Sequence, residues 1–251
     1  MKKLLCSILG VTAAATVVQA DTIGLWTFET SSNSSLSAFG PVAGSASGNI
    51  ASDIGSGSAS GFHVSTATSW TAPAGDATAS TPNSLFSLSG NNWSQKSGST
   101  YDYFQFTLNL DQVNNTYSGI NLTWDQTGSN TGPKTWGLYY STDGGTTFTL
   151  FGADYAIVNG SWNTTTVAQS HESADLSALT ALNTLSTLIL RVVDDSPTTS
   201  GAINGGNVGT TGTGRIDNFS INASVISVPE PSSLALGGLG LTLLGLLRKR
   251  A

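Results

Sequence analysis

The stretch TWGLYYSTDGGTTFTLF, residues 135–151, decides the fold class of this chain. Trp136, Leu138 and Tyr140 fall on one side of an extended segment, which is the period-two pattern of a strand with one buried face. The Asp-Gly-Gly sequence at 143–145 tolerates the positive φ that a tight hairpin requires. The stretch therefore predicts two antiparallel strands joined by a short turn.

Further strands are expected on both sides of this hairpin. They lie at residues 23–29, 103–110, 120–124, 187–193 and 215–222. Segments rich in Gly, Ser and Thr at 31–60 and 196–214 are expected to be long surface loops. Asp175 is expected to be the N-cap of a short helical turn, the one helix of the body. This pattern predicts an all-β, antiparallel β-sandwich of jelly-roll type.

Charge is sparse and unevenly distributed. The chain has 251 residues and a formal net charge of −6. Residues 21–227 contain 14 acidic and 4 basic side chains, so the body is anionic. It lacks the clustered Lys and Arg with which proteins neutralise phosphates, so we expect no nucleic-acid partner.

The first twenty residues have the three-part order of a secretory signal. A basic start is followed by an apolar stretch and by the small residues Val18 and Ala20. We expect export through the Sec translocon and cleavage by signal peptidase between Ala20 and Asp21, with a buried N-terminal helix as the alternative. Cleavage would remove Cys6, the single cysteine, so no internal disulfide is expected.

The chain carries no recognisable catalytic motif. His63 and His171 are far apart in sequence and have no metal-binding spacing. Glycosidases require two paired carboxylates, and no such pair is evident. The candidates are Glu29, Glu172, Asp175, Asp194, Asp195 and Asp217. A solvated turn is the expected setting of Asp194 and Asp195. We therefore expect no catalytic residues, with a glycoside hydrolase as the less favoured alternative.

The positions of the tryptophans indicate, more weakly, that the protein binds sugar. Trp70, Trp93 and Trp162 lie in polar, loop-like contexts and are candidate sugar contacts, whereas Trp124 and Trp136 are expected in the core. A carbohydrate-binding module is thus an alternative function.

Glu29 and Asp217 belong to the expected first and last strands, which in jelly rolls run close together near the chain ends. Two carboxylates brought together would suit Ca²⁺, so a structural calcium site is the one cofactor considered. Two separately solvated acids are the alternative.

The C-terminal segment combines a rigid motif, an apolar run and a basic end. Pro229 and Pro231 hold Glu230 in an extended conformation. The apolar run at 234–247 would form a helix of roughly 21 Å, short of a bilayer core of about 30 Å. The basic residues that follow favour a membrane segment with the body outside. They are Arg248, Lys249 and Arg250. A buried core helix is the alternative.

This order of features resembles the PEP-CTERM sorting signal of Gram-negative bacteria that make extracellular polysaccharide. The motif consists of Val228, Pro229, Glu230 and Pro231. The resemblance implies recognition and tail removal by exosortase, an integral-membrane cysteine protease or transpeptidase. The chain would divide into a signal peptide at 1–20, a body at 21–225 and a sorting segment at 226–251. It would pass from an inner-membrane-anchored intermediate to the cell surface or the extracellular matrix.

Parts of the body also resemble passengers common in this group. The similar segments are TGPKTWGLYYSTDGGTTFTLF, DLSALTALNTLSTLILRV and RIDNFSIN. Such passengers are similar to carbohydrate-binding jelly rolls and mostly have no assigned activity. The resemblance implies an exported, noncatalytic surface or matrix protein, with polysaccharide as a candidate partner.

Overall fold

The computed structural model describes residues 20–29, 46–63, 70–71, 87–94, 101–159 and 171–228. Every strand pairing within these ranges is antiparallel, and the helical content is one short 3₁₀ helix, η2 (Thr180–Thr184). The strands are β1 (Ala20–Trp26), β2 (Ala46–Ala51), β3 (Ser56–Phe62), β4 (Trp70–Thr71), β5 (Leu88–Asn91), β6 (Tyr103–Asn109), β7 (Asn115–Gly128), β8 (Thr135–Ser141), β9 (Thr149–Leu150), β10 (Tyr155–Ala156), β11 (His171–Asp175), β12 (Thr187–Asp194) and β13 (Thr213–Ser227). The predicted all-β antiparallel class is confirmed.

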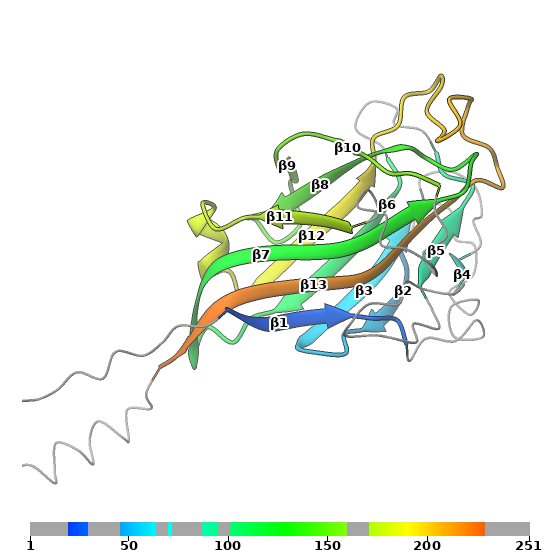
Figure 1. Ribbon diagram of the computed structural model, residues 1–251. Helices are drawn as coiled ribbons and strands as arrows, with labels where there is room; N and C mark the ends of the chain where they lie inside the picture. Colours follow the sequence, from blue (N-terminus) through cyan, green and yellow to red (C-terminus); the bar gives the residue numbers. More distant parts are fainter. Residues whose placement is uncertain are drawn as a thin grey trace, which may run out of the picture.

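The strands form two sheets that face each other (Figure 1). One has the order β11-β7-β13-β5-β4, with β1 also paired to β13. The other has the order β10-β8-β12-β6-β3-β2, with β9 paired to β8. Strand β13 is central to the first sheet, because β7 pairs along one edge while β1 and β5 share the other edge.

Aromatic side chains fill the space between the sheets. In β6, Phe104, Phe106 and Leu108 are buried and alternate with half-buried residues, as the period-two pattern predicts. Phe106 stacks on Phe219 of the opposite sheet, with ring centroids 3.6 Å apart. Trp136 is fully buried, which confirms its predicted place in the core. Trp124, 3% exposed, is likewise in the core as predicted.

The predicted hairpin is confirmed. Strand β8 pairs with β9, with Tyr139 opposite Leu150. Gly144 and Gly145 have φ values of 73° and 91°, the left-handed conformations that glycine adopts without a Cβ clash. Asp143 accepts hydrogen bonds from the backbone N–H and the hydroxyl of Thr147, which closes the turn.

The loop expected at 31–60 is partly wrong, because β2 and most of β3 lie within it. Their sequences, ASGNIA and SGSASGF, lack the large alternating side chains by which strands are recognised. The structure shows why small residues are needed. A Cβ at Gly57 would lie 2.7 Å from Cζ2 of Trp26 and 2.5 Å from the carbonyl oxygen of Thr107. Small residues in β3 thus make room for a large ring packed across the core.

Two expected boundaries are also wrong. Strand β1 ends at Trp26, before Glu29, because Phe28 adopts a left-handed φ of 58° that breaks the extended conformation. Asp175 lies in β11 and accepts a hydrogen bond from the backbone N–H of Ser177, so it closes a turn. The 3₁₀ helix begins later, at Thr180, and has no side-chain cap.

The two terminal segments lie outside the described residues. The expected signal peptide at 1–20, of which only Ala20 is described, the motif residues Pro229, Glu230 and Pro231 and the apolar run at 234–247 therefore remain predictions. No helix within the described ranges has the length and apolar character needed to cross a bilayer. Ala20 and Asp21, on either side of the predicted cleavage position, belong to β1.

Candidate functional site

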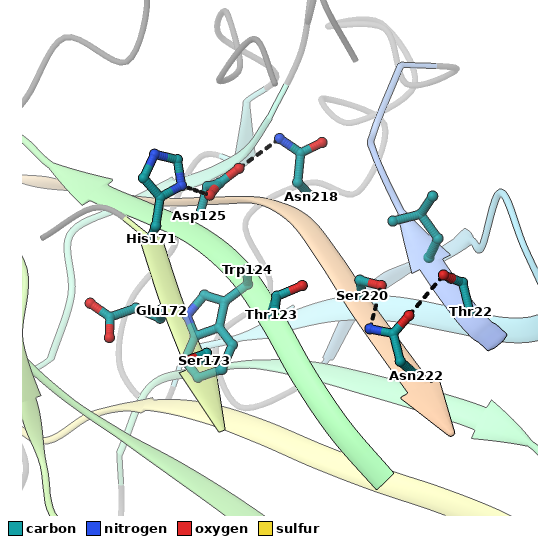
Figure 2. A pocket seen from close by; sticks show the side chains of 11 residues that line it. Thr22, Thr123, Trp124, Asp125, His171, Glu172, Ser173, Asn218, Ser220 and Asn222 are labelled. Atoms are coloured by element: carbon teal, nitrogen blue, oxygen red, sulfur yellow. Dashed lines mark hydrogen bonds and ion pairs between the residues drawn. The ribbon is translucent and has the colours of Figure 1, made fainter. Parts of the chain in front are cut away.

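A polar hollow of about 580 Å³ lies on the first sheet, across β11, β7, β13 and β1. Most of the residues that line it carry a hydroxyl, amide, imidazole or carboxylate group, although apolar atoms also contribute to its surface (Figure 2). The lining residues are Thr22, Leu25, Thr123, Trp124, Asp125, His171, Glu172, Ser173, Asn218, Ser220 and Asn222.

Asp125 is the centre of the hydrogen-bonding arrangement in this hollow. Its carboxylate lies between two side chains from neighbouring strands (Figure 2). Nδ1 of His171 contacts one oxygen, and the amide of Asn218 donates to the other at 2.8 Å. Burial raises the pKa of Asp125, while the hydrogen bond from Asn218 and the charge of His171 act in the opposite direction. The arrangement can bind a proton or orient a ligand that forms several hydrogen bonds.

A β-bulge places Asn218 in this position. The register between β13 and β7 shifts between Asp217 and Ser220, and Asn218 has a φ of 48°. Asparagine tolerates this left-handed conformation better than most residues. Bulges redirect side chains, and here the extra residue turns its amide toward Asp125.

A second hydrogen-bonded row lies at the other end of the hollow. The hydroxyl of Thr22 donates to the side-chain oxygen of Asn222 at 2.8 Å. The amide of Asn222 in turn donates to the hydroxyl of Ser220 at 3.2 Å. Strand β1 thus completes the hollow along the edge of β13 (Figure 2).

Glu172 touches the hollow but points away from Asp125 (Figure 2). It follows His171 directly in β11, and successive side chains of a strand face opposite sides of the sheet. Glu172 instead borders a smaller cavity of about 180 Å³ with Trp124 and Tyr155. Burial raises the pKa of Glu172 to about 7, although the charge of His171 acts in the opposite direction. The two carboxylates therefore lie on opposite faces.

The structure corrects the expected setting of Asp194 and Asp195. Instead of a solvated turn, both are buried at the end of β12. Tyr139 donates to Asp195 at 2.7 Å, and the backbone N–H of Ser196 donates to Asp194 at 3.0 Å. Burial, with smaller contributions from the charges of Asp102 and Asp195, raises the pKa of Asp194 to about 7, although the hydrogen bonds with Ser196 act in the opposite direction. This acidic cluster is closed to solvent, so it belongs to the interior.

The candidate sugar-stacking tryptophans have different outcomes. Trp93 is 5% exposed and packs edge-on against Trp136 and Phe104. Its indole N–H donates to the carbonyl of Gly90 at 2.8 Å. A ring in this position stabilises the core and has no open face for a sugar. Trp70 begins β4, but its side chain lies outside what the structure describes, as does all of Trp162.

The calcium hypothesis for Glu29 and Asp217 is untested. Their segments do lie together, because β1 pairs with β13 and Trp26 lies opposite Phe219. Asp217 is buried and accepts a hydrogen bond from the backbone N–H of Asn218. Within the described residues, no three His, Cys, Asp or Glu side chains are arranged to hold a metal ion.

Sequence reasoning missed the Asp125, His171 and Asn218 arrangement. One signal was present: in RIDNFSIN the apolar residues Ile216 and Phe219 are three positions apart, which breaks the period of two. Such a break is the signature of a bulge. The partner of the bulge could not be inferred, because Asn218 and Asp125 are 93 residues apart in sequence.

The C-terminal segment matches a known family model. Residues 227–251 match the PEP-CTERM protein-sorting motif, which confirms the resemblance. This motif implies export, membrane-associated sorting and processing by an exosortase. No curated protein matches the chain significantly.

Several solved structures are similar at low identity. The CBM22-1–GH10 modules of Clostridium thermocellum endo-1,4-β-D-xylanase 10B, complexed with xylohexaose, are 16% identical, with a TM-score of 0.37. That alignment covers 68% of this chain and 27% of the xylanase chain. The K3 and K1 cleaved adhesin domains of Lys-gingipain from Porphyromonas gingivalis W83 are 12% and 14% identical, with TM-scores of 0.31 and 0.30. These alignments cover 55% and 61% of this chain and 74% and 82% of the adhesin domains. Such TM-scores carry no argument about what this chain binds.

Proposed function

We propose that this protein is an exported, noncatalytic β-sandwich that an exosortase sorts and trims at its C-terminus. The observation that carries the proposal is the match of residues 227–251 to the sorting motif. Signal peptidase would cut between Ala20 and Asp21 after Sec export. The run at 234–247 would then hold the body at the outer face of the inner membrane, with the basic end 248–250 in the cytoplasm. Tail removal would deliver the body to the cell surface or polysaccharide matrix of a Gram-negative bacterium.

Replacement of Pro229, Glu230 and Pro231 by alanine tests this proposal. In a host that expresses an exosortase, the intact mass of the wild-type protein should show a loss of the tail. The triple variant should retain its tail and stay in the membrane fraction. Equal trimming and equal location of both proteins would contradict the sorting role.

A carbohydrate-binding role is the second candidate, and the polar hollow favours it. Sugar hydroxyls are both donors and acceptors, and the hollow offers carboxylate, amide and hydroxyl partners fixed by neighbouring strands. Trp70 and Trp162 remain candidate stacking residues for the same ligand. A calcium ion at Glu29 and Asp217, if bound, would support the fold beside this sheet.

Glycan-array binding by the wild type and by Asp125→Asn and Asn218→Ala variants tests this role. Thr199→Ala, at an exposed position that does not line the hollow, is the matched control. Binding that is lost in both hollow variants and kept in the control would support the role. Absence of binding by the wild type to host and self polysaccharides would count against it.

A further inference from the structure

The sorting motif follows a strand that is paired up to its final residue. Strand β13 runs to Ser227, which lies opposite Asn115 of β7. The backbone N–H of Val228 donates to the carbonyl of Asn114 at 2.7 Å. Pro229, the first residue of the PEP sequence, comes next. The sheet and the motif therefore have no spacer between them.

Among the residues that the structure describes, Val225–Val228 pair with a strand on one side only. The pairing of β13 with β1 reaches Ser224, opposite Ala20, and beyond this point β7 is the one described strand that pairs with β13. Ile226 and Val228 are 48% and 46% exposed, and Val225 is the one apolar residue of this segment that packs against the core. Such segments open at the lowest free-energy cost of any part of a fold. We call Val225–Val228 the terminal ladder.

An enzyme that cuts at the motif must also bind the residues on either side of it. Enzymes and domains that bind peptides in extended form contact their backbone N–H and C=O groups over several residues. On the N-terminal side of the motif, these residues are the terminal ladder, whose backbone is already used by β7. On the other side, the apolar run begins at Leu234, at most about 20 Å of extended chain beyond Val228. While the terminal ladder is paired with β7, the motif can therefore move only a short distance from the sandwich.

We propose that the terminal ladder must leave β7 before exosortase can act, so that Val225–Val228 form the upstream part of the segment that the enzyme holds. This inference rests on the proposed sorting function. In the closed state the backbone is occupied and the motif is held close to the sandwich. In the open state the ladder supplies four residues of free chain with two exposed aliphatic side chains, and the rest of β13 stays paired with β1 and β7. The stability of the ladder would then set the rate of tail removal.

A disulfide that locks the ladder tests the proposal. Ser227 and Asn115 are directly opposite each other, so Asn115→Cys with Ser227→Cys would join the strands within the ladder. The matched control is Ser118→Cys with Ser224→Cys, which joins the same strands just inside the ladder and leaves it free. Signal cleavage removes Cys6, so no native cysteine competes in the exported protein.

The full chain would be expressed with an exosortase, and tail removal would be followed by intact mass under oxidising and reducing conditions. We expect the locked variant to be processed roughly tenfold more slowly or worse, because few molecules then present a free end. Reduction should restore the rate, and the control disulfide should leave it unchanged. Four Gly/Ser residues inserted after Val228 should also rescue the locked variant, because the inserted residues would then replace the terminal ladder as the free segment upstream of the motif.

An opposite perturbation covers failure of the disulfide to form. Thr116→Pro deletes the backbone N–H of β7 opposite Ile226 and should accelerate tail removal. Wild-type rates in the oxidised locked variant, or in Thr116→Pro, would overturn the proposal. These outcomes are distinct from failure of the sorting function, in which the wild type itself keeps its tail or the alanine-substituted motif is trimmed normally.

Discussion

Asp194 should make the protein less stable as the pH rises. Its side chain is fully buried, and burial together with nearby Asp102 and Asp195 raises its pKa from an ordinary 3.8 to about 7. The folded protein therefore holds this proton more tightly than the unfolded chain does. The contribution of Asp194 to stability is complete below about pH 4 and is lost as the pH rises through about 7.

The size of the effect follows from the difference in pKa. A difference of about 3 pH units corresponds to about 4 kcal/mol of unfolding free energy, at about 1.36 kcal/mol per unit. Between pH 5 and pH 8 the expected loss is about 2.5 kcal/mol, because ionisation of the unfolded chain is already well advanced at the lower value. Asp194→Asn removes the titration and keeps an oxygen that can accept the hydrogen bond from Ser196.

Guanidinium unfolding at a series of pH values measures this effect. The wild type should lose stability across the range, and Asp194→Asn should show a much smaller slope. Glu172→Gln is the comparison, because the pKa of Glu172 is also raised to about 7 but its side chain is half-exposed, so water screens its contribution. A wild-type stability that rises with pH, or an Asp194→Asn variant with the wild-type slope, would refute the reasoning.

Three further changes have defined outcomes. Gly57→Ala should destabilise the protein by about 1–3 kcal/mol in urea unfolding, because its Cβ would lie 2.7 Å from the Trp26 ring; an unchanged midpoint would contradict this packing. Tyr139→Phe removes the donor to buried Asp195 and should cost about 1–3 kcal/mol by the same measurement, and a neutral result would mean that water replaces the hydroxyl. Asp143 has a pKa lowered to about 2 by hydrogen bonds within the hairpin turn, so its contribution should be lost only as the pH falls from about 4 through 2. Amide exchange in the turn across this acid range checks the last prediction, and exchange that is already fast at neutral pH would contradict it.

Large alternating side chains made part of the fold predictable. Phe104, Phe106 and Leu108 indicate β6 without ambiguity, and the Asp-Gly-Gly turn indicates the β8–β9 hairpin. Strands β2 and β3 were not predicted, because Gly and Ser in a strand resemble a loop in sequence, and in β3 the small residue Gly57 leaves space for Trp26. The structure supplies the missing information, which is the position of Trp26 across the core.

The candidate site was harder to predict than the fold. Asp125, His171 and Asn218 come from three strands whose order in the sheet depends on long-range pairing. Asp194 shows the same limit in another form: two adjacent aspartates before a proline suggest a solvated turn, but the end of β12 is covered by other segments. The sorting motif was predictable because its residues are contiguous.

The central position of β13 affects how the molecule transmits force. A pull on a tail held in a membrane would act along the axis of this strand, which is hydrogen-bonded to β7 on one edge and to β1 and β5 on the other. Once Val225–Val228 have separated from β7, the force would act on the hydrogen bonds along both edges of β13 at the same time. These bonds would then have to break together. The part of β13 that is paired on both edges should therefore resist a pulling force far better than the terminal ladder, which should separate first.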